Sequence, residues 1–260
     1  MPNLLWMPNA LLRSGCKVAL RDGWETRGRA TFGEFKGVMI HHTASAQHNK
    51  NAPSLGVVTN GRSDLSGPLC NLLQARDGAF FAVAAGRANH AGAGTWHGVT
   101  NGNSNTIGIE CENDGVGEPW PEAQVQFLAM GVAALLDYGN LPTLMCMGHR
   151  EYATPKGRKI DPDFDMDAFR LRIDAIRNGA APRPLIPAKD AQSRPTLRRG
   201  MKGKDVEALQ RALGVKVDGD FGPKLEAAVR AWQRAHKLPV ADGIWGPSSR
   251  AAFDAVKVAA

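Results

Sequence analysis

The residues of this chain with the widest chemical range are its histidines, of which there are seven. His41 directly follows an apolar run at residues 38–40, and His149 follows a second apolar run at residues 143–147. If these runs are buried strands, each holds an imidazole rigidly at a strand end. Asp161, twelve residues beyond His149, can add a carboxylate oxygen. Two imidazoles and one carboxylate leave the fourth position of a tetrahedral zinc site open to water, which is the arrangement of a catalytic zinc.

Residue types alone favour a structural role for each of these histidines, because a single histidine at a strand end is more often a hydrogen-bonded structural residue than a metal ligand. The further candidates are His42, His90 and His97, since His48 lies in a polar loop and His236 lies in the last quarter of the chain. Neighbours in a regular strand point to opposite faces, so we expect one ion to be reached by His41 or His42 but not by both.

Charged residues near these histidines could move protons or stabilise negative charge. Glu110 and Glu112 are two residues apart, so a strand presents both on one face and periodicity cannot separate them. Lys156, Arg158 and Lys159 all precede Asp161, and all three are basic. The four cysteines include no CxxC pair, so we expect free thiols at buried positions and synthesis in a reducing compartment.

The segments that must position these residues alternate between strand-like and helix-like patterns. Short apolar runs predict buried strands at residues 38–40, 80–84, 107–111 and 143–147. Apolar residues at helical spacing predict one helix from Pro121 towards Tyr138 and another over residues 166–176, which Gly179 ends. Strands mixed with helices indicate an α/β domain, with a mixed central sheet flanked by helices. Residues 1–35 carry no motif, and either an additional edge strand or a contribution to a groove is open to them.

A linker divides the chain. Four of the sixteen prolines fall in residues 178–195, which lack a sustained apolar period. We therefore expect a catalytic domain at residues 1–177 and a second domain at residues 196–260. The net charge of +7 comes entirely from the part after position 177, which has 15 basic and 8 acidic residues, whereas residues 1–177 have 17 of each. A basic tail favours a polyanionic partner such as nucleic acid, anionic lipid or an acidic wall polymer.

An internal repeat organises the second domain. Asp-Gly-Asp-Phe-Gly-Pro at residues 218–223 returns 24 residues later as Asp-Gly-Ile-Trp-Gly-Pro at residues 242–247, and each copy precedes a helical pattern. With a further helical pattern at residues 206–213, this predicts a three-helix, all-α module. The repeat resembles the peptidoglycan-binding domain at the ends of many bacterial and phage cell-wall hydrolases. The resemblance implies that peptidoglycan is the partner of this domain.

The first domain contains three short motifs whose order along the chain is informative. They are Ile-His-His-Thr-Ala at residues 40–44, Asn-Thr-Ile-Gly-Ile-Glu at residues 105–110, and Gly-His at residues 148–149 followed by Gly-Arg-Lys-Ile-Asp-Pro at residues 157–162. Together they resemble the zinc N-acetylmuramoyl-L-alanine amidases, whose fold the peptidoglycan recognition proteins share. The resemblance covers about residues 35–177. It implies hydrolysis of the amide that joins the lactyl group of N-acetylmuramic acid to L-alanine of the stem peptide.

The resemblance also implies a role for each matching residue. Zinc falls on His41, His149 and Asp161, and His42 lies beside the ion or packs nearby. Glu110 becomes the general base, Lys159 stabilises the oxyanion, and His90 and Asn105 contact the substrate. Some phage amidases have a tyrosine in the strand before the Arg-Asp-Gly turn, where this chain reads Leu-Cys-Asn at residues 69–71. Any role of that tyrosine therefore falls to Glu110.

Composition and motifs together argue against other classes of protein. Hydrophobic content of 43%, charged content of 22% and a mean hydropathy of -0.28 are typical of a soluble globular chain. No apolar run approaches the roughly 18 residues that cross a bilayer, and no convincing signal peptide is seen. We expect a monomeric phage endolysin, made in the host cytoplasm and acting at the cell wall, with a bacterial autolysin as the alternative.

Three rival functions belong to different classes. Peptidoglycan recognition without hydrolysis is disfavoured because all three zinc-ligand positions match. Nucleic-acid binding by the tail is disfavoured because the tail has no basic stripe interleaved with aromatic residues. A cysteine peptidase is disfavoured because no cysteine lies in a recognisable Cys/His motif.

Overall fold

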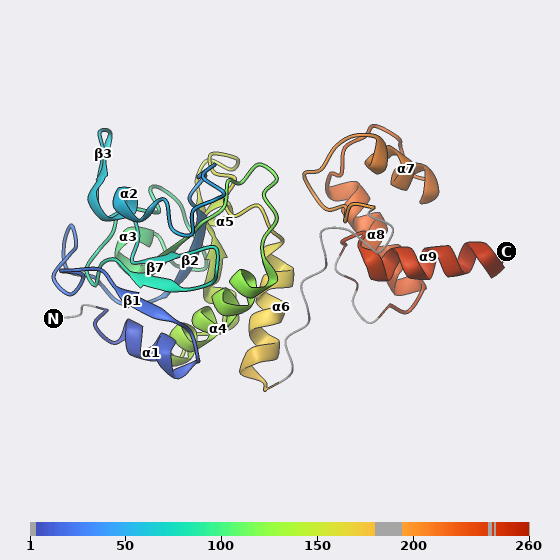
Figure 1. The fold of residues 1–260 in the computed structure, drawn as a ribbon. Coiled ribbons are helices and arrows are strands. Elements are labelled where there is room, and N and C mark those ends of the chain that lie inside the picture. Colours follow the sequence, from blue (N-terminus) through green and yellow to red (C-terminus); the bar gives the residue numbers. More distant parts are fainter. Residues whose placement is uncertain (1–3, 180–193, 239–240, 242, 260) are drawn as a thin grey trace. The chain divides into compact units, whose positions relative to one another are not determined.

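The computed structural model of the chain describes residues 4–179, 194–238, 241 and 243–259 (Figure 1). The chain forms two compact units, Met1–Arg183 and Pro184–Ala260. The division falls within the predicted linker at residues 178–195, most of which lies outside the described residues. No helix among the described residues is both long enough and apolar enough to cross a membrane.

A six-stranded mixed sheet lies at the centre of the first unit, which confirms the predicted α/β class. The strands are β1 Val18–Leu20, β2 Gly37–His42, β5 Leu72–Gln74, β6 Phe80–Ala82, β7 Thr106–Cys111 and β8 Cys146–Gly148, in the spatial order β1-β6-β5-β7-β2-β8. Neighbouring strands are parallel except for β5 and β6, which are antiparallel. Every residue of β2 is buried, because a central strand in a largely parallel sheet is covered on both faces.

Three of the four predicted strands are confirmed as β2, β6 and β7. The fourth prediction is wrong in its first half. Thr143–Met145 forms a 3₁₀ turn, and only Cys146–Gly148 pairs with β2. Pro142 immediately precedes the turn, and its fixed φ of −70° favours a turn over the continuation of a strand.

Helices cover this sheet. They are α1 Met7–Arg13, α2 Leu55–Asn60, α3 Gly102–Asn105, α4 Glu122–Tyr138, α5 His149–Tyr152 and α6 Met166–Arg177, and a small hairpin of β3 Gly61–Arg62 and β4 Leu65–Ser66 follows α2. α4 packs against both α1 and α6, and Figure 1 shows these three helices on one side of the sheet. The two predicted helices are confirmed as α4 and α6, although Pro121 precedes α4 instead of beginning it.

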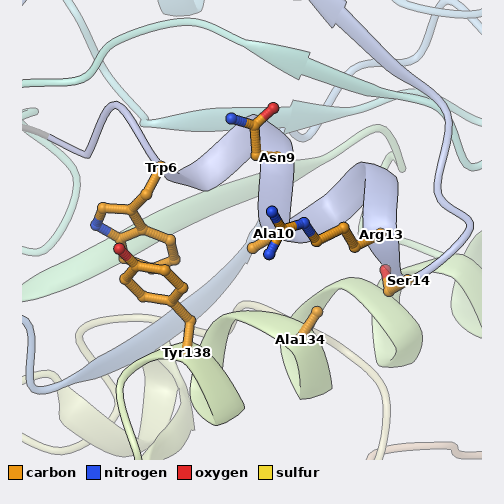
Figure 2. Close-up of a pocket in the computed structure, with 7 residues that line it drawn as sticks. All are labelled: Trp6, Asn9, Ala10, Arg13, Ser14, Ala134 and Tyr138. Atoms are coloured by element: carbon orange, nitrogen blue, oxygen red, sulfur yellow. The ribbon is translucent and has the colours of Figure 1, made fainter.

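The N-terminal segment adds an edge strand, since β1 pairs with β6 alone at the border of the sheet. It also places α1 on α4, where Trp6 stacks on Tyr138 with ring centroids 3.8 Å apart. The two helices form a groove, which Figure 2 shows, lined by Trp6, Asn9, Ala10, Arg13, Ser14, Ala134 and Tyr138. None of the predicted site residues lines this groove.

The described residues of the second unit form three helices, as the repeat predicted: α7 Lys204–Ala212, α8 Pro223–Ala235 and α9 Pro247–Ala259. The buried apolar core of this unit is Leu197, Val206, Leu209, Phe221, Leu225, Val229 and Trp245. A buried glutamine holds each repeat loop. Gln210 accepts hydrogen bonds from the N–H groups of Asp218 and Gly219, and Gln233 accepts one from the N–H of Gly243. The repeat is therefore a loop-and-helix unit that is clamped twice in the same way.

Candidate active site

Three side chains meet near the carboxyl ends of β2 and β8. His41 belongs to β2, His149 is the first residue of α5, and Asp161 lies in the loop before α6. The two Nδ1 atoms are 2.9 Å apart, and Oδ2 of Asp161 lies 3.0 Å from each of them. All three residues are buried. Among the described residues, two groups of three side chains could hold a metal ion, and this group is the buried one.

Strand register and one backbone hydrogen bond bring these residues together. The pairing of β2 with β8 ends one residue before each histidine, which sets His41 and His149 side by side. The N–H of Arg150 donates to the carbonyl of Asp161 at 2.7 Å. This hydrogen bond holds the loop that contains Asp161 next to His149. The sequence predicted that His41 follows its strand, whereas it lies within β2, one residue before the end.

The protonation of the three residues suits a divalent cation. Nε2 of His149 lies 2.9 Å from the carbonyl oxygen of Ala91, and because a carbonyl can only accept, Nε2 carries the proton and Nδ1 presents a lone pair. Burial, and then the nearby His149, lower the pKa of His41 to about 4, so His41 is neutral near neutral pH. Burial by itself raises the pKa of Asp161, but its contacts with His149 and His41 lower the pKa overall and keep the carboxylate ionised. Neutral imidazoles with a carboxylate form a donor set that fits zinc.

A second group of one histidine and two acids, His48 with Asp114 and Glu118, is different in kind. The His48 side chain is half exposed, and its Nε2 and Nδ1 face two different carboxylates at 3.6 and 3.5 Å. The guanidinium of Arg76 already donates to Glu118 at 2.6 and 2.9 Å. This group is a salt-bridged contact between loops, and it lacks the convergence of lone pairs that a metal centre needs.

Glu110 lies beside the three buried residues. In the register of β7 and β2 it is directly opposite His41. The residue is partly buried overall, but its Oε2 is fully buried and has no hydrogen-bond partner. Burial, and then the charge of Asp161, raise the pKa of Glu110 well above its ordinary value, and the Lys159 ammonium opposes this rise. A buried and unpartnered carboxyl group with a raised pKa is suited to proton exchange.

The contacts separate Glu110 from Glu112, which periodicity could not. Glu112 is fully buried, and its carboxylate accepts hydrogen bonds from the hydroxyl of Thr43 and from both the N–H and the hydroxyl of Ser54. Its oxygens are therefore occupied within the protein. Glu112 ties the segment after β2 and the start of α2 to the end of β7.

The contacts also distinguish the three basic residues before Asp161. Lys156 donates to the carbonyl of Glu151, and Arg158 donates to the carbonyls of Thr154 and Ala93. Lys159 is half-buried, and its positive charge lowers the pKa of both His41 and Glu110. Lys159 is thus the basic residue whose charge is felt at the centre of the site.

The two predicted substrate contacts, His90 and Asn105, both make hydrogen-bond contacts within the protein. His90 is buried behind His41, with its ring nitrogens 3.1 Å from Nε2 of His41 and 3.3 Å from the carbonyl of Thr106, so both nitrogens are engaged inside the protein. The amide of Asn105 donates to the carbonyl of Glu34 at 2.8 Å, just before β7 begins and at the other end of that strand from Glu110.

Two groups that orient the histidines of the site could not be predicted from the sequence. The Ala91 carbonyl, which accepts from His149, is a backbone atom and has no sequence signal. The side-chain oxygen of Asn103 accepts hydrogen bonds from the N–H groups of His90 and Ala91, and a lone Asn in a polar loop gives no hint of this.

A cysteine nucleophile receives no support from the structure. All four cysteines are free and buried. Burial raises the pKa of each thiol, at Cys16, Cys70, Cys111 and Cys146, which disfavours the reactive thiolate.

Comparison with known proteins places the two units in families. Residues 31–164 match the N-acetylmuramoyl-L-alanine amidase family, and residues 202–253 match the peptidoglycan binding domain family. No curated protein matches the chain.

The chain is also similar to several solved structures. AmiD from E. coli, in complex with anhydro-N-acetylmuramic acid-L-Ala-D-gamma-Glu-L-Lys, is 22% identical, with an alignment that covers 90% of this chain and 92% of AmiD and a TM-score of 0.44. A selenomethionine derivative of AmpD is 23% identical, with 59% of this chain and 98% of AmpD covered and a TM-score of 0.44. The endolysin LysCS from Clostridium intestinale URNW is 14% identical, with 61% of this chain and 95% of LysCS covered and a TM-score of 0.48.

The amidase match spans just over half of the chain and includes His41, Glu110, His149, Lys159 and Asp161. Membership of this family supports amidase activity on peptidoglycan, and the second match adds a peptidoglycan-binding domain. On this combination of fold, buried site and matched residues, the chain belongs to the N-acetylmuramoyl-L-alanine amidase family.

Proposed function

We propose that the protein is a zinc-dependent amidase that hydrolyses the bond between the lactyl group of N-acetylmuramic acid and L-alanine of the stem peptide. The observation that carries the proposal is the meeting of His41 Nδ1, His149 Nδ1 and Asp161 Oδ2 within 3.0 Å, inside the segment that matches the amidase family. Three protein ligands leave a position open for water or a carbonyl oxygen, as in catalytic zinc sites.

The residues around this open position have different roles in the proposed amide hydrolysis. His41, His149 and Asp161 would hold the zinc ion, which when bound would supply a Lewis acid for the scissile carbonyl and for water. In its ionised form, which the positive charges of a bound cation and of Lys159 favour, Glu110 accepts a proton from the attacking water and returns it to the nitrogen of L-alanine, so that the C–N bond breaks and a neutral amine departs. Lys159 places a positive charge near the carbonyl oxygen, which becomes negative as water adds to the carbon.

Proton transfer is assigned to Glu110 alone. Its Oε2 makes no hydrogen bond within the protein, so no protein donor competes for the proton-accepting oxygen. Cys70, in the segment where some phage amidases have a tyrosine, is fully buried and has a raised pKa, so its thiol is unsuited to share this task.

We propose that the second domain, residues 196–260, holds the enzyme on peptidoglycan. The excess of basic over acidic residues after position 177 favours attachment to an acidic polymer. Tethering raises the effective concentration of the catalytic domain at an insoluble substrate without any new catalytic contact. We further propose that the enzyme acts as a monomer and lyses host cells as a phage endolysin. The test is to add the purified protein to permeabilised bacteria. Rapid clearing of the suspension would support the endolysin role, whereas slow release of fragments without clearing would favour an autolysin.

The decisive experiment measures bound zinc together with the products released from purified peptidoglycan. We compare the wild type, a chelated sample, Glu110→Gln and the exposed control Glu25→Gln. The proposal predicts bound zinc and new N-terminal L-alanine without new reducing sugar ends, with cleavage lost on chelation and in Glu110→Gln but kept in the control. Tight binding to the wall with no bond cleaved would make the protein a peptidoglycan recognition protein instead.

A further inference from the structure

His90 lies behind His41 in a line of hydrogen bonds that begins at the backbone of β7. Only 8% of the residue is exposed. Its Nδ1 lies 3.1 Å from Nε2 of His41, and its Nε2 lies 3.3 Å from the carbonyl oxygen of Thr106. The rings of His90 and His41 meet edge to face, with centroids 5.2 Å apart and planes at 86°. His90 therefore touches the side of His41 that faces away from His149 and Asp161.

The direction of these hydrogen bonds follows from their far end. The Thr106 carbonyl can only accept, so Nε2 of His90 carries a proton. A neutral imidazole has one proton, which leaves Nδ1 of His90 as an acceptor for Nε2–H of His41. With its proton on Nε2, His41 presents an unprotonated Nδ1 to the point where Nδ1 of His149 and Oδ2 of Asp161 also converge.

The protein is built to keep His90 in this position. A Cβ atom on Gly108 would lie 2.6 to 2.7 Å from Cγ, Cδ2 and Nδ1 of His90, so the ring fits only because residue 108 has no side chain. The side-chain oxygen of Asn103 accepts from the N–H groups of His90 and Ala91 at 2.8 and 2.7 Å. The Ala91 carbonyl in turn accepts from His149. One short segment thus orients both histidines, His41 through a side chain and His149 through a carbonyl.

We propose that His90 is a positioning residue that fixes the tautomer of His41, so that Nδ1 is unprotonated and ready to bind the metal. The proposal rests on the proposed zinc site, and it assigns His90 to the metal centre instead of the substrate groove. Without an acceptor at Nε2, the more stable tautomer of His41 has its proton on Nδ1, because Nδ1–H can then donate to the ionised Asp161 at 3.0 Å. That tautomer cannot bind zinc through Nδ1. Loss of such an outer hydrogen-bond partner typically lowers metal affinity by about 10- to 100-fold.

The test compares His90→Phe, which removes the acceptor, with His90→Gln, which can accept from His41 and donate to Thr106. The matched control is His42→Phe, which is also a histidine-to-phenylalanine substitution. His42 follows His41 in β2, and its buried Nδ1 has no hydrogen-bond partner. Two quantities are measured. The first is the tautomer of His41 in the metal-free protein, from the ¹⁵N chemical shifts of the ring nitrogens near neutral pH. The second is zinc affinity, by competition with a chelator.

We expect the proton on Nε2 of His41 in the wild type, in His90→Gln and in His42→Phe, and on Nδ1 in His90→Phe. Zinc affinity should fall about 10- to 100-fold in His90→Phe only. A folded His90→Phe protein with an unchanged tautomer and unchanged affinity overturns the proposal. If His90→Phe does not fold, Gly108→Ala displaces the ring without removing it, and it must give the same two changes or the proposal fails. A wild type that binds no zinc refutes the proposed metal site, while the tautomer in the metal-free protein still decides the role of His90.

Discussion

Replacing Glu110 with Gln keeps the shape of the side chain and removes its charge, and the structure predicts opposite effects on activity and stability. The catalytic effect follows from the assignment of Glu110 as the group that accepts and returns the proton. Loss of a general acid–base group typically lowers the rate about 10²- to 10⁴-fold, which corresponds to about 2.7 to 5.5 kcal/mol in activation free energy. The assay is the rate at which new N-terminal L-alanine appears from a soluble muropeptide, with zinc content measured in parallel and expected to stay unchanged.

The stability effect follows from the raised pKa of Glu110 in the folded protein, whose ordinary value is 4.5. Below that value both folded and unfolded chains hold the proton, so ionisation has no effect on stability. As the pH rises further, the unfolded chain releases the proton while the folded chain retains it, and folding loses up to about 1.4 kcal/mol per pH unit until the folded pKa is reached. Gln has no such loss. The stability of metal-free Glu110→Gln relative to the wild type should therefore increase from mildly acidic to neutral pH.

Urea denaturation of both metal-free proteins at two pH values measures this difference. The exposed control Glu25→Gln should show neither the loss of activity nor the pH-dependent gain in stability. If Glu110→Gln retains wild-type turnover, the assignment of the general base is wrong. If its stability relative to the wild type does not change with pH, the carboxyl group is not desolvated in the folded protein, and the electrostatic argument fails.

Removing zinc with a chelator should destabilise the first unit only, by roughly 2.7 kcal/mol when the initial zinc concentration is 100 times its Kd, and an unchanged unfolding midpoint would contradict the metal site. Lys159→Met should lower turnover about 10²- to 10³-fold with zinc content unchanged, and Lys156→Met should not; equal effects in steady-state assays would refute the assignment of the oxyanion contact. Gln210→Leu leaves the buried N–H of Gly219 without its acceptor, so urea denaturation should show the second unit destabilised by about 1 to 3 kcal/mol, and wild-type stability would rule out the clamp.

Local patterns in the sequence were sufficient to predict the five longest helices of the described residues, and they also indicated a linker. The prolines of residues 178–195, the apolar spacing of α4 and α6 and the repeated Gly-Pro step act over a few neighbouring residues, so they can be recognised without knowledge of the fold. The strands β1 and β5 have three residues each, which is too short for a period of two to stand out. The turn at Thr143–Met145 reads as apolar as a strand, and only strand pairing showed where β8 begins.

Within the site, motif order was sufficient to predict that His41, His149 and Asp161 come together, and the structure brings their ligand atoms within 3.0 Å. The family motif favoured Glu110 over Glu112, but the physical reason for that preference needed the tertiary structure. A period of two places both on one face, but the donors that occupy Glu112 come from Thr43 and Ser54, more than fifty residues away in the sequence.

The proposed role of His90 also rests on contacts between distant segments. The sequence shows which residue types are present and how they are spaced, and from these it predicts faces and elements. Whether a polar side chain meets solvent, a substrate or another side chain depends on packing between distant segments. His90 is buried because Gly108 leaves space for its ring and Asn103 holds its backbone. The physical reason is that hydrogen-bond partners and desolvation are properties of the three-dimensional environment, and these set the tautomers and the pKa values on which the chemistry of the site depends.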